Sequence, residues 1–315
     1  MAEATNSLSV ERHHVFKQIA RAIYKVPGSK TSVRVLTRAA LTTLPLSLKN
    51  RQRLYNFSAE DTIPNRTLTC RIHPPFGKPV KAELDLQDGL SRTLYYWGYA
   101  GYEPATVRVF LNLLRTKNCV FDVGANVGYY TLLAASVLEG SGEVHAFEPC
   151  PRVFHLLSKN VKLNNWQCLR LNRMALAEAD GEQRLFIPSS GSGTNASLIE
   201  NFTKQDSFEM VQTIRFDSYC HKNIKGRVDL IKLDVEGAEM SVLRGAGTLF
   251  DEWSPDVICE VLKPFEGELD RFFTSKAYRK FLITDDGLQE KDHLDAHNRY
   301  RDYYLSRTPT HGLTN

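Results

Sequence analysis

The sequence predicts an α/β fold with a doubly wound, mostly parallel sheet. From residue 118 onward, short apolar runs typical of strands alternate with segments of helical periodicity. One run, Val228–Leu233, is apolar almost throughout, as expected of a strand that is covered on both faces. Another run, Cys119–Val123, leads through a glycine-containing turn into a helix, the place where open α/β sheets bind ligands.

Residues 1–60 are predicted to form a basic helical extension. They carry ten Lys and Arg against three Asp and Glu, whereas the other 255 residues carry 30 against 33. Residues 10–26 have helical periodicity and a stripe of Lys17, Arg21 and Lys25. Two interpretations stay open: peripheral contact with an anionic membrane or partner, or a helix packed on the domain. The slightly acidic remainder gives no clear case for nucleic-acid binding.

Residues 61–117 are predicted to lead into the core as a strand pair and a helix. Apolar and polar residues alternate around Cys70 and around Ala82, on either side of a Pro-Pro-Phe-Gly turn at 74–77. A helix is expected over 104–116, with Pro104 in its first turn.

Residues 118–315 are predicted to form the main domain. Its expected strands are 119–123, 143–147, 168–171, 228–233, 257–261, 281–284 and 303–306. Its expected helices are 129–138, 151–163, 237–245 and 269–278. A further strand pair, 185–187 and 211–216, flanks a Gly- and Ser-rich loop at 189–197. That loop is either a flexible lid or an ordinary hairpin loop.

The six cysteines include no pair at the Cys-x-x-Cys spacing of zinc and redox motifs. Cys119 and Cys259 lie in apolar runs and are expected to be buried free thiols, which suits a reducing compartment. No secretory signal is visible, and no apolar run reaches the length of about 18 residues that a membrane span needs. We therefore expect a cytoplasmic protein without a transmembrane segment.

The most informative stretch follows the strand 119–123. Gly124 and Gly128 permit close backbone approach and positive φ angles. Dinucleotide-binding loops have a glycine at the middle position of this turn, where Asn126 would obstruct a pyrophosphate. Asp122 at the strand end would repel phosphate, but it suits the amino and sulfonium groups of S-adenosylmethionine.

A second acid follows the next strand. Glu148 lies 24 residues past Gly124, about the separation from which an acid accepts hydrogen bonds from ribose hydroxyls. One acid at a strand end is ordinarily a surface charge, but Asp122 and Glu148 in this order favour S-adenosylmethionine as the ligand.

On these residues the sequence resembles the FkbM family of methyltransferases. The matching segments are 102–104, 120–131, 147–149, 175–177 before Gly181, and 230–239. The strings Asp-Val-Gly-Ala-Asn-Val-Gly and Ile-Lys-Leu-Asp-Val-Glu-Gly-Ala-Glu are together specific. The resemblance covers roughly residues 80–285. It implies a class I, Rossmann-like methyltransferase with seven strands, and O-methylation of a sugar or natural-product-like small molecule.

The resemblance also implies which residues contact the cofactor. Around the methionine part it places Asp122, Gly124, Asn126 and Gly128. Glu148 would hold the ribose, and Asn172 and Ala175, after the third strand of the domain, would lie near the adenine.

Asp234, Glu236 and Glu239 are the candidate catalytic acids. Asp234 ends the strand 228–233 and is expected at the same edge as Asp122. Three alternatives stay open: a general base for a hydroxyl acceptor, a divalent metal site for a diol, or helix capping and dipole partners. Lys232 is available to pair with one of the acids.

Other candidates carry less weight. Glu260, at the end of strand 257–261, is positioned to contact the acceptor. His293 and His297 have the i, i+4 spacing of some metal sites, but segment 285–302 is polar and a solvated face is expected.

Three other functions remain to be weighed. The first is methylation of another atom or of a macromolecule, although no aromatic-and-basic cluster of RNA-binding type is present in the main domain. The second is a nicotinamide-dependent oxidoreductase, which Asn126 disfavours. The third is a non-catalytic cofactor-binding scaffold, which would be marked by loss of the acids at 234, 236 and 239.

Overall fold

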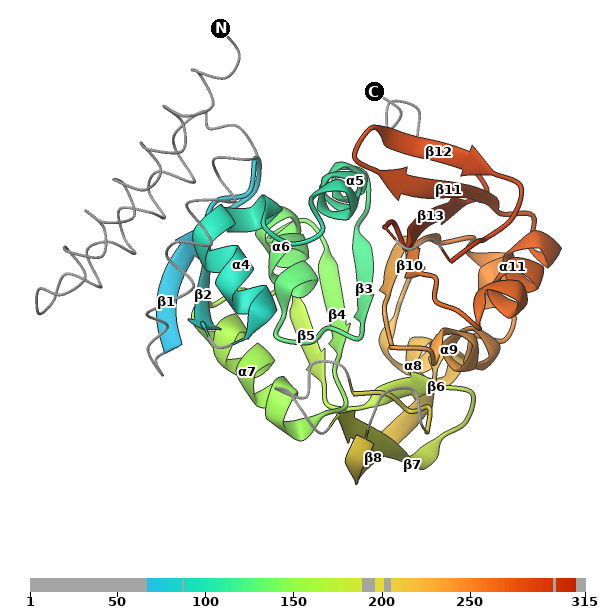
Figure 1. Cartoon of the computed structure of the whole chain (residues 1–315), viewed down its shortest axis with the longest axis horizontal. Coiled ribbons are helices and arrows are strands. Elements are labelled where there is room, and N and C mark those ends of the chain that lie inside the picture. The colour runs from blue at the N-terminus through green and yellow to red at the C-terminus, as the bar shows by residue number, and fades with distance from the viewer. Residues whose placement is uncertain (1–66, 87, 189–195, 201–204, 297–298, 310–315) are drawn as a thin grey trace, which may run out of the picture. The chain divides into compact units, whose positions relative to one another are not determined.

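The computed structural model describes residues 67–86, 88–188, 196–200, 205–296 and 299–309 (Figure 1). The chain divides into two compact units, one made of 1–68 with 84–102 and the other of 69–83 with 103–315. The basic extension over 1–60 and most of the loop at 189–197 lie outside the described residues, and the expectations for them stay predictions. The expected domain boundaries near residues 60 and 117 also stay predictions.

The described part of the first unit contains helix α4 (Gly89–Trp97) and the short 3-10 helix η1 (Gly98–Ala100). The carboxylate of Asp88 accepts a hydrogen bond of 2.7 Å from Ser91 N and so caps α4. We did not expect this helix from the sequence. The expected strand pair before it is confirmed as β1 (Thr67–Ile72) and β2 (Val80–Asp85), which form a two-stranded sheet.

Eight strands form the main sheet of the second unit, in the order β12-β11-β13-β10-β9-β3-β4-β5. The bounds are β3 (Cys119–Val123), β4 (Glu143–Phe147), β5 (Leu169–Asn172), β9 (Leu230–Leu233), β10 (Asp256–Glu260), β11 (Arg279–Thr284), β12 (Gly287–Lys291) and β13 (Asp302–Ser306). Strands β10, β9, β3, β4 and β5 are parallel, whereas β13 is antiparallel to both β10 and β11. The predicted α/β class and mostly parallel core are confirmed.

The expected number of seven strands is not what the structure shows, because β12 is added at the edge. β12 forms an antiparallel hairpin with β11, and its sequence Gly-Leu-Gln-Glu-Lys is polar. An edge strand with three exposed residues has no apolar alternation, so segment 285–302 looked loop-like.

Helices cover both faces of the main sheet (Figure 1). One face carries α5 (Pro104–Leu114), α6 (Tyr129–Leu138) and α7 (Pro151–Lys162). The other carries α8 (Phe216–Asn223), α9 (Glu239–Gly245) and α11 (Glu266–Ser275). The short helix α10 (Leu249–Glu252) shares their apolar core. The doubly wound arrangement and five of these helices were expected, whereas α8 and α10 were not. Helix α6 is buried on almost every side, which fits its nearly uniform apolar sequence.

A separate three-stranded sheet has the order β6-β8-β7, with β6 (Ala175–Ala177), β7 (Gly181–Pro188) and β8 (Gln205–Arg215). β7 and β8 are antiparallel, so the expected strand pair is confirmed and is longer than predicted.

All six cysteines lie in the described part of the chain as buried free thiols, as expected of Cys119 and Cys259. No helix within the described residues is long and apolar enough to cross a membrane.

Candidate active site

The turn between β3 and α6 is strained and tightly packed. Gly124, Asn126 and Gly128 have φ angles of 86°, 51° and 99°. The N–H groups of Gly124 and Ala125 both donate to the carbonyl of Phe147 at the end of β4, at 3.0 and 2.9 Å. A Cβ on Gly124 would collide with the backbone carbonyl of Asp234. The turn is therefore held directly between the carboxyl ends of β4 and β9.

Glu148 lies buried beside this turn. Its Oε2 accepts from Asn126 N at 3.0 Å, and its Oε1 accepts from Cys150 N at 2.8 Å. Each carboxylate oxygen can accept a second hydrogen bond. Burial raises the pKa of Glu148 to about 7. An acid with unused acceptor capacity at this position fits the ribose hydroxyls that the sequence motif predicts.

Asp122 lies beneath the turn, on the face that α6 covers. Its Oδ2 accepts a hydrogen bond of 2.5 Å from Thr131 Oγ1, and burial raises its pKa to about 6. It is paired in register with Lys232 of the neighbouring strand β9. Asp122 thus anchors the start of α6, and its predicted contact with the methionine part of a cofactor stays a prediction.

The structure brings Asn172, but not Ala175, next to Glu148. The carbonyl of Asn172 accepts from Glu148 N at 3.1 Å, and the Asn172 amide donates to Ala146 O at 3.1 Å. Ala175 is buried in the small sheet, where it pairs with Thr213. Their predicted place near an adenine is not tested by these contacts.

A buried lysine lies at the centre of the acidic cluster. The side chain of Lys232 is 1% exposed, and its Nζ lies 3.1 Å from Asp234 Oδ2 and 3.5 Å from Asp302 Oδ1. Nζ also lies over the ring of Tyr130, 5.1 Å from its centroid. Despite its burial, the acids Asp234 and Asp302 raise the pKa of Lys232 well above its ordinary value. Lys232 is therefore a permanent cation among these acids.

Two further acids surround this cation. Glu103, the residue before α5, accepts a hydrogen bond of 2.6 Å from the Tyr130 hydroxyl. Burial and the nearby Asp302 raise the pKa of Glu103 to about 7. Burial and Asp234 raise the pKa of Glu260 to about 9, and Arg301 lies 3.7 Å from its carboxylate. No role for Glu103, Tyr130 or Asp302 follows from the sequence alone, because α5, α6 and β13 meet at the cluster only through the fold.

The other two predicted acids, Glu236 and Glu239, have different surroundings. Glu236 has a φ of 53°, and burial together with Asp234 raises its pKa to about 7. Glu239 is buried, and its Oε1 accepts from Val235 N at 3.1 Å and from Gly237 N at 3.2 Å. Glu239 therefore holds the turn before α9. The alternative that Asp234 or Glu236 caps α9 is wrong, because Ala238 is the N-cap and makes no side-chain capping bond.

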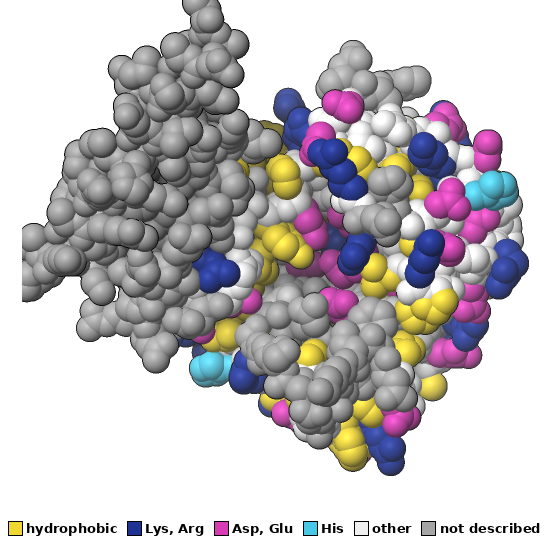
Figure 2. Space-filling model, in the orientation of Figure 1, with side chains coloured by type: hydrophobic (Ala, Val, Ile, Leu, Met, Phe, Trp, Pro, Cys, Tyr) yellow, Lys and Arg dark blue, Asp and Glu magenta, His cyan; other side chains and the backbone are white. Residues whose placement is uncertain are grey.

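The acids at 234, 236 and 239 do not converge as a metal site. In the described part of the chain, the one group of three His, Cys, Asp or Glu residues whose ligand atoms lie within 4.8 Å of one another is elsewhere. His293 is exposed and lies 3.3 Å from Asp270, and His297 falls outside the described residues. Figure 2 shows acidic side chains gathered where the middle of the drawn face is hollowed.

A family model described as the methyltransferase FkbM domain matches residues 122–280, which is half of the chain. The chain belongs to the FkbM methyltransferase family. The matched segment contains the turn after β3, Glu148 and the acids from Asp234 to Glu260. Glu103 and Asp302, which complete the cluster around Lys232, lie outside it.

Curated methyltransferase relatives match this chain over part of their length. Methyltransferase 1 of Beauveria bassiana is 30% identical over 144 residues, which cover 40% of this chain and 57% of the relative. Hexuronic acid methyltransferase AglP of Haloferax volcanii is 27% identical, with coverages of 45% and 56%. The 31-O-demethyl-FK506 methyltransferase FkbM of Streptomyces tacrolimicus is 29% identical, with coverages of 42% and 60%. The chain thus spans 56–60% of the length of these relatives.

Among solved structures, the chain is similar to the methyltransferase FkbM from Methylobacillus flagellatus. The identity is 16% and the TM-score 0.40, and the match covers 60% of this chain and 43% of the other.

Proposed function

We propose that this chain transfers a methyl group from S-adenosylmethionine to a hydroxyl group of a small molecule of the sugar or natural-product kind. The observation that carries the proposal is the contact between Gly124 and the backbone of Asp234. It puts the turn that should hold the cofactor directly beside the acids that should meet the acceptor. Family membership and the mostly parallel α/β fold support the same reaction.

For the cofactor, the fitting residues are those around the turn after β3. Glu148 would accept the ribose hydroxyls, and Asn172 would contribute beside it. Asp122, Gly124, Asn126 and Gly128 would surround the methionine part, and Ala175 would lie near the adenine. S-adenosylmethionine supplies an electrophilic methyl group, so the protein has to position an oxygen nucleophile and accept its proton.

For the acceptor, we assign proton removal to Asp234. Its side chain is 27% exposed, whereas that of Asp302 is 10% and that of Lys232 is 1% exposed. Lys232 and Asp302 would orient Asp234, and Glu236, whose pKa is about 7, would be the second acid near the acceptor. Glu239 would act indirectly, because its carboxylate holds the backbone at 235 and 237.

An oxygen acceptor is also suggested by the relatives. One is named as a hexuronic acid methyltransferase and another as a 31-O-demethyl-FK506 methyltransferase. Those matches cover little more than half of each relative. They therefore support oxygen as the proposed acceptor atom and do not identify a particular substrate.

A ligand and product screen tests the proposal. We expect S-adenosylhomocysteine to raise the melting temperature. At a hundredfold excess over its dissociation constant, the free energy of unfolding should increase by about 3 kcal/mol. NAD should have no effect. With methyl-labelled S-adenosylmethionine, label should enter polyhydroxylated small molecules and not their amine or thiol analogues. Stabilisation by NAD alone would contradict methyl transfer. Labelled RNA, labelled protein or a label on a nitrogen atom would show that the acceptor is not a small-molecule hydroxyl group.

A further inference from the structure

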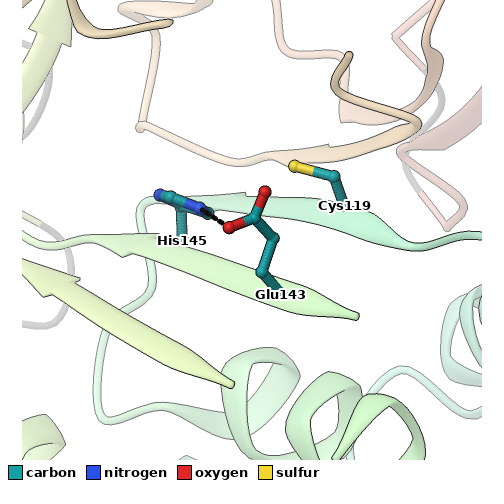
Figure 3. Close-up of side chains that lie close together, drawn as sticks. All are labelled: Cys119, Glu143 and His145. Atoms are coloured by element: carbon teal, nitrogen blue, oxygen red, sulfur yellow. Dashed lines mark ion pairs between the residues drawn. The ribbon is translucent and has the colours of Figure 1, made fainter. Parts of the chain in front are cut away.

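A second group of reactive side chains lies at the amino ends of β3 and β4. Cys119 opens β3 and is paired in register with Glu143, which opens β4, and His145 follows two residues later. Register partners in parallel strands, and residues two apart in one strand, point to the same face of a sheet. All three side chains therefore share the face covered by α8 (Figure 3). Their ligand atoms lie within 4.8 Å of one another.

The placement of His145 suits a metal ligand. Its side chain is fully buried, and its Nδ1 lies 2.7 Å from the hydroxyl of Tyr219 on α8. Its Nε2 is paired with Glu143 Oε2 at 3.2 Å, in a geometry short of a regular hydrogen bond. A buried nitrogen without a hydrogen bond is uncommon. Metal-binding histidines have this arrangement, with one ring nitrogen bonded to a neighbouring group and the other turned toward the ion.

The spacing of the three groups suits a tetrahedral ion. Zinc bond lengths of about 2.0–2.3 Å to N, O and S place neighbouring ligand atoms about 3.3–3.8 Å apart. The 3.2 Å between His145 Nε2 and Glu143 Oε2 is already close to that range. The Glu143 side chain is 37% exposed, so it has room to adjust toward Cys119.

A surface pocket of about 670 Å³ lies beside Cys119 and Glu143, and His145 is not part of its lining. Its lining includes Cys119, Glu143 and Asp229. The Asp229 carboxylate is already used, because it accepts from the N–H groups of Asn118 and Cys119 and pairs with Arg227. Solvent water is therefore available for a fourth coordination position, which Asp229 does not fill.

We propose that Cys119 Sγ, the Glu143 carboxylate and His145 Nε2 bind one borderline-soft divalent ion of the zinc class, with a water molecule from the pocket as fourth ligand. The ion would join the amino ends of β3 and β4. Gly124 and Glu148 lie at the opposite, carboxyl ends of the same two strands, so this site is separate from the proposed methyl-transfer site. On binding, the thiol of Cys119 loses its proton to solvent and the sulfur becomes a thiolate ligand.

Cobalt(II) is the probe for the test, because a thiolate ligand gives Co²⁺ a charge-transfer band and four-coordination gives intense visible absorption. After chelator treatment, we expect the wild-type chain to develop both signals, saturating at about one ion per chain. Zn²⁺ should displace the cobalt. The matched control is Cys168→Ser, which removes another buried thiol whose sulfur instead lies 3.8 Å from Ala135 O of α6.

Three variants identify the ligands. Cys119→Ser should abolish the charge-transfer band. His145→Asn can keep a contact with Tyr219 but lacks Nε2. It should raise the dissociation constant for cobalt by at least about 10- to 100-fold, the loss typical of changes to outer-shell residues. Glu143→Gln, at the partly exposed position, should raise the dissociation constant without loss of the circular dichroism spectrum. If Cys119→Ser or His145→Asn unfolds the chain, the dissociation constant of Glu143→Gln decides the test.

Two results would overturn the proposal. One is the absence of a thiolate–cobalt band from the wild-type chain, which would mean that the Cys119 thiol and Glu143 interact only with each other. The other is a band that survives Cys119→Ser, or an equal affinity in wild type and Glu143→Gln.

Discussion

At the scale of single residues, the charge on Lys232 organises the candidate active site. A buried ammonium group is costly unless acids compensate it, and Asp234 and Asp302 both lie within 3.5 Å of Nζ. The same acids would repel one another without the lysine. The cation therefore allows several carboxylates to gather at the end of β9, and their exposure decides which of them an acceptor can reach.

Substitution of Asp234 tests its assignment as the base. Asp234→Asn should lower turnover by about two to four orders of magnitude, because an amide cannot take the hydroxyl proton. Affinity for S-adenosylhomocysteine, measured by calorimetry, should change little. The matched control is Asp251→Asn, since Asp251 also pairs with a lysine but lies on α10. Near-normal turnover of Asp234→Asn would move the role of base to Glu236 or Glu260.

Substitution of Glu148 tests the ribose contact. Glu148→Gln should weaken S-adenosylhomocysteine binding by about 1.5–3 kcal/mol, roughly 10- to 100-fold, because hydrogen bonds to a charged acceptor are lost. The matched control is Glu139→Gln, since the Glu139 carboxylate also accepts from two backbone N–H groups, those of Gln167 and Cys168, but follows α6. Unchanged affinity of a folded Glu148→Gln variant would show that Glu148 only binds the backbone of Asn126 and Cys150.

At the scale of elements, the strand–turn–helix unit from β3 to α6 is fixed from three sides. Two N–H groups of the turn bind the end of β4, Gly124 touches the end of β9, and Asp122 binds Thr131 in the first turn of α6. The turn is thus shaped by the chain itself before any ligand binds, which lowers the conformational cost of binding.

Replacing Gly124 should break this unit. Gly124→Ala should destabilise the protein by more than about 1 kcal/mol, because a Cβ strains a φ of 86° and also meets the Asp234 carbonyl. Gly140→Ala is the matched control, since Gly140 has a φ of 87° but open space around it. Denaturant unfolding measures both. Equal losses would mean that backbone strain, not contact with β9, makes the glycine necessary.

At the scale of the whole molecule, buried glutamates make stability depend on pH. Burial raises the pKa from 4.5 to about 7 at four positions, Glu103, Glu148, Glu236 and Glu239. Between these values the folded chain holds protons that the unfolded chain has lost, so stability falls as pH rises through about 7. The raised pKa values of Asp122 and Glu260 act in the same direction, whereas the lowered pKa of His145 acts in the opposite direction.

We therefore expect the ligand-free chain to melt at a lower temperature near pH 8 than near pH 5.5, two values that bracket a transition at about 7. Differential scanning calorimetry in matched buffers measures the slope. Glu148→Gln should flatten it, since one of the four groups no longer titrates. A melting temperature that rises over this range would show that the four carboxyl groups are ionised in the folded chain.

Most local elements, and the glycine-containing turn after β3, were predictable from the sequence alone. Buried strands such as β3 and β9 are apolar runs, and helices such as α6 have clear boundaries, so periodicity was sufficient. The order of Asp122, Gly124, Asn126 and Glu148 along the chain also identified the end of the sheet that they share. These signals are readable because they depend on neighbours within about 25 residues, close to the separation of Gly124 and Glu148.

The contacts between side chains far apart in the sequence could not be predicted and are seen in the folded chain. Asp302 reaches Lys232 because β13 is inserted antiparallel between β10 and β11. The group formed by Cys119, Glu143 and His145 depends on the register of β3 and β4, and no paired-cysteine motif announces it. Burial then sets the pKa of each acid. Such contacts depend on strand order and packing. Both are properties of the whole chain, so no single segment of the sequence predicts them.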